Sequence, residues 1–120
     1  MQYGLRKSSR LRSSREFARI YDLKQRAGDQ NLLVFAAQND LDFSRFGLSV
    51  SKKHGNAVQR SRLKRLLREA FRLCQHELPR GLDLILIPRQ ASGAQLGDYQ
   101  QSLLQLARKL AKRLLVEDQQ

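Results

Sequence analysis

The stretch AVQRSRLKRLLREAFRLCQHEL, residues 57–78, carries the strongest helical pattern in the chain. Its apolar residues recur at helical spacing and form one stripe: Leu63, Leu66, Leu67, Ala70, Phe71, Cys74 and Leu78. At about 100° per residue its cations fall on the opposite arc: Arg60, Arg62, Lys64, Arg65, Arg68 and Arg72. Pro79 and Gly81 end the pattern. We therefore predict an amphipathic helix over 57–78, with one face in the core and a basic face in solvent.

The N-terminal side of this helix predicts a shorter helix and two strands. Ser13 and Glu16 have capping-box spacing and open a helix over 14–24. Its apolar residues share one face: Phe17, Ile20 and Tyr21. Residues 31–38 read as a strand, with Leu33 and Phe35 on one side and Leu32 and Val34 on the other. Residues 46–51 alternate as a half-buried strand, and the turn signal at 39–42 suggests that the two strands form a hairpin.

The C-terminal side predicts one more strand and one more helix. Residues 82–87 form a short apolar run closed by Pro88, typical of a buried strand. Asp98 and Gln101 have the spacing of a helix cap. The apolar residues of this last helix face inward: Leu103, Leu104, Ala107, Leu110, Ala111 and Leu114. The order of elements predicts a single α+β domain, a sandwich in which helices cover a mixed sheet.

Charge is concentrated in two short blocks of the chain. The 120 residues hold 23 Lys and Arg against 11 Asp and Glu, a net charge of +12. Residues 1–26 carry a net charge of +6 and residues 51–72 a net charge of +7. The positive charge of these two blocks together exceeds the net charge of the whole chain. A pair of solvated basic faces is one interpretation, and a binding surface for a polyanion is the other. Residues 1–12 are expected to form a flexible basic arm.

Catalytic side chains are scarce. Cys74 lies on the apolar stripe and is expected to be a buried thiol, while His54 and His76 are expected at the surface or in caps. Asp40 and Asp42 fall in the predicted turn. The residues present cannot form a Cys/His zinc cluster, and no apolar run is long enough for a membrane span. The protein alone is therefore not expected to be an enzyme.

The aromatic residues of the first helix and first strand have two possible roles. Phe17, Tyr21 and Phe35 could form part of an ordinary core, or they could stack on the bases of a single strand. Their pattern alone favours the core. The basic arc favours a nucleic acid as the partner, and its preference for Arg over Lys suits phosphate contacts in a folded RNA.

The stretch KKHGNAVQRSRLKRLLRE, residues 52–69, closely resembles the signature of the bacterial ribonuclease P protein component. Arg10, Leu11 and Phe17 also resemble that family, as do the length and the order of elements. One position departs from the family pattern, because Ser61 stands where the family has Asn. Serine keeps a small hydrogen-bonding group at this position but lacks the amide.

The resemblance implies a fold and a function. The family fold is a three-layer sandwich like a domain of a small-subunit ribosomal protein, with a left-handed strand–helix–strand crossover that would contain Gly55 and Asn56. The family protein binds a catalytic RNA, which cleaves the 5′ leader from precursor tRNA with Mg²⁺, in the cytoplasm. The protein itself would bind no cofactor and no metal, and it would contribute no catalytic residue. Its partners would be the RNA subunit and precursor tRNA, with no membrane.

The resemblance also implies which residues make these contacts. The RNA subunit would be bound by Lys52, Lys53, Arg60, Arg62, Lys64, Arg65 and Arg68. The leader would be bound by Phe17, Tyr21, Leu33, Phe35 and Ser61. Two other functions remain open: a ribosomal-type RNA-binding protein without a role in cleavage, and a protein-only metal nuclease. The first fits the charge equally well, and the scarcity of clustered carboxylates argues against the second.

Overall fold

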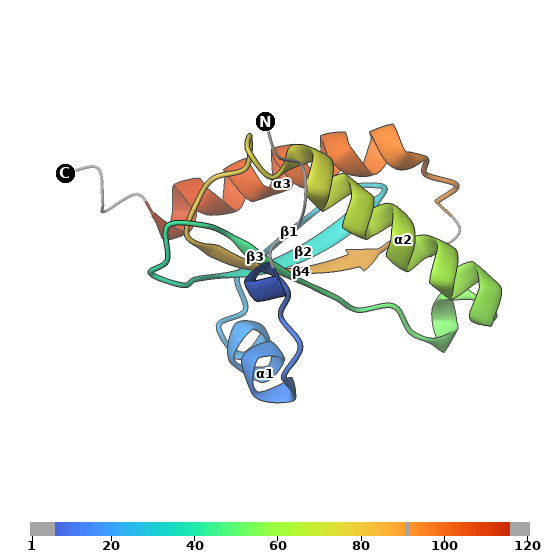
Figure 1. The fold of residues 1–120 in the computed structure, drawn as a ribbon, viewed down its shortest axis with the longest axis horizontal. Coiled ribbons are helices and arrows are strands. Elements are labelled where there is room, and N and C mark those ends of the chain that lie inside the picture. The colour runs from blue at the N-terminus through green and yellow to red at the C-terminus, as the bar shows by residue number, and fades with distance from the viewer. Residues whose placement is uncertain (1–6, 91, 116–120) are drawn as a thin grey trace.

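The computed structural model describes residues 7–90 and 92–115 (Figure 1). The elements are η1 (Lys7–Ser9), α1 (Ser14–Asp22), β1 (Arg26–Gly28), β2 (Leu32–Gln38), β3 (Arg45–Leu48), η2 (Lys52–His54), α2 (Ala57–Cys74), β4 (Leu82–Pro88) and α3 (Leu96–Leu114), where η denotes a short 3-10 helix. Within these described residues, no helix is long and apolar enough to cross a membrane.

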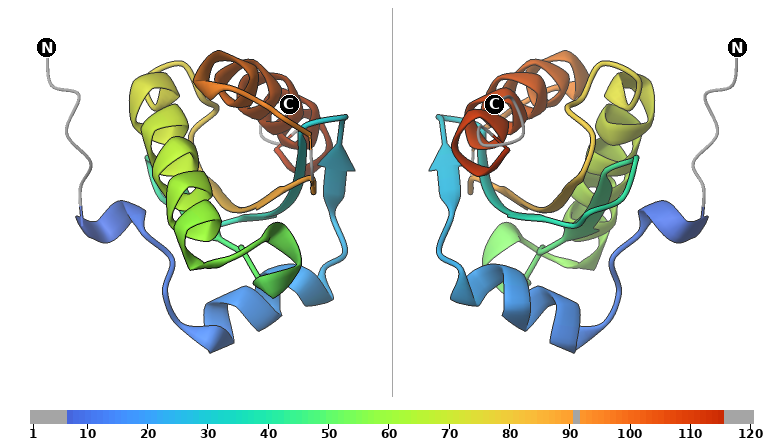
Figure 2. Two further views of the ribbon diagram at one scale, coloured as in Figure 1. Left: turned by 90° about the vertical axis from the view of Figure 1, so that its right-hand side faces the viewer. Right: turned by 90° about the vertical axis from the view of Figure 1, so that its left-hand side faces the viewer.

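The elements form three layers. A four-stranded sheet of order β1-β2-β4-β3 lies in the middle, with α2 and α3 on one face and α1 on the other (Figure 2). The sheet face under α2 and α3 belongs to the main core, in which Val34, Leu84 and Phe46 are fully buried. The α1 face holds a smaller cluster around Ile20 and Ile85. The mixed sheet, covered by helices on both faces, confirms the predicted α+β class.

The predicted hairpin between residues 31–38 and 46–51, which correspond to β2 and β3, is wrong. Strand β4 lies between them, antiparallel to β2 and parallel to β3. Alternation identifies a half-buried strand but not its neighbour, so the pattern could not reveal this insertion. The actual hairpin joins β2 to β1, a three-residue strand without an apolar run that the sequence did not indicate.

Three helix ends differ from the predicted ones, and the first is that of α1, which ends at Asp22 and not at Lys24. Helix α2 ends at Cys74, four residues before Leu78, and Leu78 remains buried in a following turn. Pro79 disfavours helical geometry at Leu78, so the helix is not expected to continue past this residue. Helix α3 begins at Leu96, and the carboxylate of Asp98 accepts from the backbone N–H of Gln95 at 2.9 Å. Asp98 therefore completes the cap from inside the first turn.

Residues 7–12 pack against the sheet, although the sequence predicts a flexible arm over 1–12. The backbone of Arg10 bridges to Phe46 of β3, and the Leu11 N–H donates to the Phe46 carbonyl at 2.8 Å. The Leu11 side chain is only 2% exposed. Apolar burial therefore fixes this segment, and the rest of the predicted arm lies outside the described residues.

Candidate nucleic-acid interface

Four apolar side chains on the α1 face of the sheet remain half-buried. Phe17 and Tyr21 come from α1, and Leu33 and Phe35 come from β2; we call this set the half-buried row. The Tyr21 ring meets the Phe35 ring edge-on at a centroid distance of 4.9 Å and lies 6.4 Å from the ring of Phe17. The structure thus gathers the four predicted apolar leader-binding residues onto one face and leaves them partly accessible.

The face stays open because α1 is short and sits toward one end of the strands. Ile20 is the fully buried anchor of this helix and packs with Ala37 and Ile85. Phe17 lies over Gly47, where a Cβ atom would come within 2.4 Å of the ring. A larger residue at position 47 would displace Phe17, so this glycine permits the close approach of α1 to β3.

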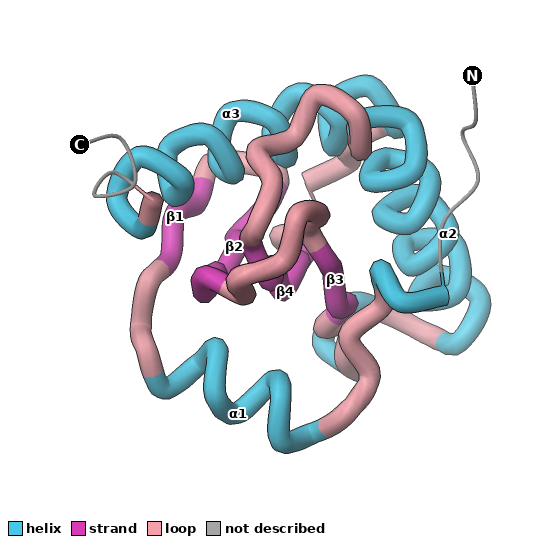
Figure 3. Tube along the Cα trace, turned by 60° about the vertical axis from the view of Figure 1, so that its left-hand side comes forward, coloured by secondary structure: helices cyan, strands magenta, loops and turns pink. Residues whose placement is uncertain are grey.

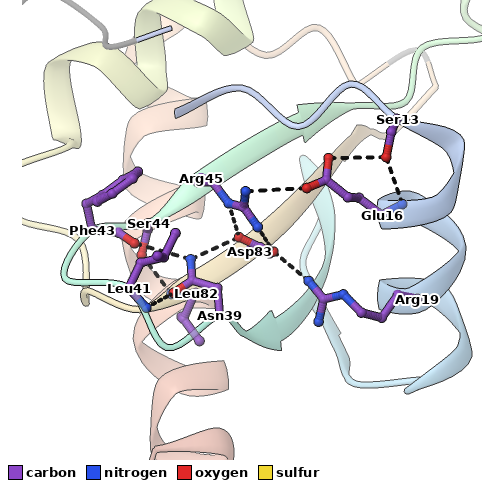
Figure 4. Close-up of polar contacts among 10 residues, drawn as sticks. All are labelled: Ser13, Glu16, Arg19, Asn39, Leu41, Phe43, Ser44, Arg45, Leu82 and Asp83. Carbon is purple, nitrogen blue, oxygen red and sulfur yellow. Dashed lines mark hydrogen bonds and ion pairs between the residues drawn. The ribbon is translucent and has the colours of Figure 1, made fainter. Parts of the chain in front are cut away.

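A buried carboxylate links α1 to the sheet (Figure 4). Asp83 of β4 is fully buried and accepts from Arg19 Nη2 at 2.6 Å and from Arg45 Nη2 at 2.7 Å. The amide of Asn39 donates to its other oxygen at 2.9 Å, and Arg45 also pairs with Glu16 at 3.3 Å. The hydrogen bonds to Asp83 raise the pKa of Arg45. Because Arg19 and Glu16 belong to α1, this network sets the position of the helix over the sheet.

A hollow of about 420 Å³ continues the half-buried row toward the start of α2. Leu33 and Ile87 line it from the sheet, and Lys53 and His54 line it from η2. Lys53 was predicted to bind the RNA subunit, and Leu33 to bind the leader. The structure therefore places the two predicted surfaces side by side.

The turn that carries Lys52 and Lys53 is fixed by local hydrogen bonds. The Ser51 N–H donates to His54 Nδ1 at 3.0 Å, so Nε2 carries the ring proton and donates to the Pro88 carbonyl at 2.7 Å. His54 is thus a capping residue, as predicted. Gly55 has φ of +123°, a conformation that side chains disfavour.

Helix α2 begins immediately after this turn. The Asn56 side chain accepts from the Gln59 N–H at 2.9 Å, and the Gln59 side chain accepts from the Asn56 N–H at 2.8 Å. These two bonds satisfy N–H groups that a helix start leaves unpaired. The Gly55–Asn56 pair therefore turns the chain and starts the basic helix.

The predicted cations of η2 and α2 point away from the core. Five of them are exposed: Lys52, Lys53, Arg62, Lys64 and Arg65. Arg60 and Arg68 are half-buried at the flank of the helix. In the part of the chain that the structure describes, none of the seven is in an ion pair, whereas Arg72 is bonded to Glu69 through two nitrogens at 2.8 and 2.9 Å. Ser61 is exposed on the same outward face of α2, apart from the half-buried row.

The two basic blocks of the sequence meet in space. The Arg10 guanidinium lies over the ring of Phe46 at 4.9 Å. Burial lowers the pKa of Arg10, and the neighbouring charges of Arg12 and Arg68 lower it further. The Nε atoms of Arg10 and Arg60 are buried without a hydrogen-bond partner among the described residues. The N-terminal segment and α2 therefore share one surface with cations in excess, the arrangement that an RNA backbone needs.

The remaining candidates for chemistry are one buried thiol and three exposed turn residues. Cys74 is buried, and burial raises the pKa of its thiol. Asp40 and Asp42 are exposed in the turn after β2. His76 is exposed in the turn after α2. In the described ranges, no three His, Cys, Asp or Glu side chains gather where they could hold a metal ion.

Sequence reasoning missed Arg89. This exposed residue follows β4 and lines both the hollow at Leu33 and a second hollow of about 340 Å³ beside Arg62. Its Nε donates to the Asp29 carbonyl at 3.1 Å, across Gly28. Continued alternation from Ile85 through Ile87 would have placed Arg89 on the open face.

Comparisons with known proteins agree on one family. The family model described as Ribonuclease P matches residues 5–114. The ribonuclease P protein component of Syntrophus aciditrophicus is 41% identical over 85 residues, 71% of each chain. That of Alkaliphilus oremlandii is 33% identical over 103 residues, 85% of this chain and 90% of the relative.

Solved structures of ribonuclease P proteins share the fold. The protein from Thermotoga maritima superposes with a TM-score of 0.76 at 32% identity, covering 83% of this chain and 96% of that one. The Staphylococcus aureus protein gives a TM-score of 0.73 at 35% identity, covering 88% and 97%. These matches extend far beyond residues 52–69, on which the resemblance in the sequence rests. The chain therefore belongs to the ribonuclease P protein family.

Proposed function

We propose that this ribonuclease P protein subunit binds the catalytic RNA through η2, α2 and the N-terminal segment, and the precursor-tRNA leader through the half-buried row. The observation that carries the proposal is the adjacency of two different surfaces. One presents cations without ion pairs among the described residues, and the other presents accessible rings beside them. A folded RNA suits the first and an unpaired strand suits the second.

The RNA-subunit surface comprises the seven predicted cations on η2 and α2, together with Arg10 and Arg12. Each phosphate that these side chains neutralise releases counterions, so binding should weaken steeply with salt. Burial and, after it, the charges of Arg12 and Arg68 lower the pKa of Arg10, so the crowding of these three cations is unfavourable in the free protein. A phosphate placed among them would relieve this repulsion and accept hydrogen bonds from their guanidinium groups.

The leader surface comprises Phe17, Tyr21, Leu33 and Phe35, with Lys53 and Arg89 at its border. Unpaired bases can stack on the two half-buried rings that contact each other, Tyr21 and Phe35, while the cations bind the backbone. Mature tRNA has no leader and would not use this surface. Ser61 lies on α2 between the cations, where its hydroxyl would bind RNA by a single hydrogen bond.

The chemical step belongs, in this proposal, to the RNA subunit and the Mg²⁺ ions bound to it, in the cytoplasm. The protein holds substrate and RNA together and lowers the repulsion between their phosphates. It should therefore reduce the salt and Mg²⁺ concentrations that the RNA needs for cleavage. The protein contributes binding and electrostatics, and no side chain of it takes or gives a proton.

Cleavage of precursor tRNA by the protein alone, by the cognate RNA alone and by both tests this proposal. We expect no cleavage by the protein alone, cleavage by the RNA alone only at high Mg²⁺, and cleavage by the two together at low Mg²⁺. A protein-only nuclease would cleave without RNA. A ribosomal-type protein would bind RNA but leave the Mg²⁺ requirement unchanged, and either result would overturn the proposal.

A further inference from the structure

We infer that the β1 edge of the sheet carries a second leader site, which binds leader nucleotides farther from the cleavage site than those on the half-buried row. This inference rests on the proposed leader function and extends it. The site consists of four exposed cations, which we call the edge strip: Lys24, Arg26, Lys109 and Arg113.

The register of the sheet connects the half-buried row to the edge strip. Arg26 of β1 pairs with Phe35 of β2, and Gly28 pairs with Leu33. Because Ala27 between them is buried toward the main core, Arg26 and Gly28 share the open face with the row. The Arg26 guanidinium lies over the Phe35 ring at 5.9 Å. A strand bound on Phe35 and running away from α2 must therefore pass Arg26.

Helix α3 brings the other cations of the strip to the same edge. Arg113 Nη1 donates to the Arg26 carbonyl at 2.8 Å, which ties the last turn of α3 to β1. Ser102 accepts from the Asn31 side chain at 3.3 Å, so this flank of α3 faces the β1–β2 hairpin. Lys109 and Arg113 lie seven and eleven residues after Ser102, on the same flank.

The arrangement is visible along the chain trace. Strand β1 lies between the end of α1 and the C-terminal end of α3 (Figure 3). Lys24 lies in the connection between α1 and β1, with φ of +56°. The strip therefore follows the rim of the sheet from the loop after α1, past β1, to α3.

The charge of the strip is available for a ligand. Among the described residues, none of its four cations is in an ion pair. The acidic residues nearest in sequence to Lys24 and Arg26 are Asp22 and Asp29, and those nearest to Arg113 are Glu117 and Asp118, which lie outside the described residues. The Asp29 carboxylate is engaged by the N–H groups of Asn31 and Leu32, each at 2.9 Å. Within the described ranges, cations thus remain in excess at this edge.

The separation between the strip and the RNA-subunit surface makes the strip a site for the part of the leader farthest from the cleavage site. Neighbouring strands lie about 4.8 Å apart, so β1 is roughly 14 Å from β3, beside which the RNA-subunit surface begins. A leader that ends on the half-buried row reaches no farther than Arg26, and a longer one continues past Arg26 along the rest of the strip. The occupant we infer is single-stranded RNA, because the strip continues a surface of rings and presents cations along the edge of the sheet.

Binding of precursors by the holoenzyme tests the inference, with leaders shortened one nucleotide at a time. For the wild type, affinity should rise in two stages as the leader lengthens. Arg26→Gln combined with Arg113→Gln should remove the second stage, lowering affinity for the longest leader about three- to ten-fold. The slope of log affinity against log salt should fall by roughly 0.7 per lost contact to a single strand. Arg26→Gln alone leaves the hydrogen bond from Arg113 to the β1 backbone in place, so it should not disturb the packing of α3 on β1. It should lower affinity for the longest leader less than the double variant does.

Arg108→Gln is the matched control, because Arg108 is an exposed α3 cation whose charge acts on Cys74, on the α2 side of the helix. It should bind every leader like the wild type. Equal losses for long and short leaders, a loss with mature tRNA, weaker binding of the RNA subunit, or no loss at all would each overturn the inference. If the wild type binds precursor and mature tRNA equally, the proposed leader function itself fails, which is a separate result.

Discussion

The two faces of the sheet are built from similar residues but differ in how completely helices cover them. Under α2 and α3, with 18 and 19 residues, the apolar side chains of β2 and β4 are fully buried. Under α1, with nine residues, Leu33, Phe35 and Ile87 stay half-buried. A short helix, anchored by Ile20 and Asp83, can therefore stabilise one end of a sheet face and leave the other end accessible.

Two phenylalanines give the sharpest test of this contrast. Phe46 is fully buried and stacks on Phe71 at a centroid distance of 4.3 Å, whereas Phe35 lies on the open face. Phe46→Ala should lower the free energy of unfolding by about 3–5 kcal/mol. Phe35→Ala should lower it by less than half as much, because the ring is already partly hydrated. Urea denaturation measures both, and equal losses would mean that the open face is an ordinary core.

Phe35→Ala should have its larger effect on binding. Loss of a stacking ring should weaken precursor-tRNA binding by about 1–3 kcal/mol per base, while mature tRNA binding stays unchanged. Affinities of the holoenzyme for the two RNAs, measured side by side, check this. Leu41→Ala is a useful control, because Leu41 is 39% exposed in the turn after β2, away from the row. Equal weakening for precursor and mature tRNA would contradict a leader site at Phe35.

Cys74 tests the covered face from the side of α2. It is the single cysteine of the chain, and burial raises the pKa of its thiol. Thiol alkylation should be slow in the native protein, and the pH at which its rate rises should lie above that of a free thiol, because the thiolate reacts. Cys74→Ser should cost about 1–2 kcal/mol of stability and leave cleavage at low temperature intact. A fast-reacting thiol whose removal abolishes cleavage would contradict this assignment.

The smallest expected change in stability falls on the outward face of α2. Arg65→Ala should change the free energy of unfolding by no more than about 0.5 kcal/mol. It should nevertheless weaken RNA-subunit binding and reduce the salt slope by roughly one unit, as should Arg60→Ala and Arg68→Ala. Arg72→Ala is the internal comparison, because Glu69 already holds that guanidinium. Filter binding against salt gives the slopes, and unchanged slopes for all three variants would remove this face from the interface.

Local pattern was sufficient to predict the helices and most strands. Helical spacing identified α1 and both faces of α2, and Ser13 caps α1 as predicted, accepting from the Glu16 N–H at 3.1 Å. Alternation also assigned the faces of β2 correctly, which placed Leu33 and Phe35 together. These features depend on residues a few positions apart, which a sequence displays directly.

Features that depend on distant pairing could not be predicted. The insertion of β4 between β2 and β3 brings Asp83 beside Arg19 and Arg45, yet no local pattern links these three residues. The docking of residues 7–12 depends on Phe46, far along the chain. Strand β1 can be identified only from its pairing with β2, because its own three residues have no strand pattern. The predicted roles of the RNA-binding and leader-binding residues stay predictions, because they concern RNA.

The central position of β4 delays completion of the sheet while the chain is being synthesised. Strand β4 is the last strand to be synthesised, and its partners in β2 lie 44 to 56 residues earlier. The sheet cannot close until residue 88 has left the ribosome, and long-range closure of this kind slows folding. Helix α2 is made of local contacts and can form first. The basic helix should therefore acquire order early, whereas the half-buried row, which is the proposed leader surface, is complete only when the last strand inserts.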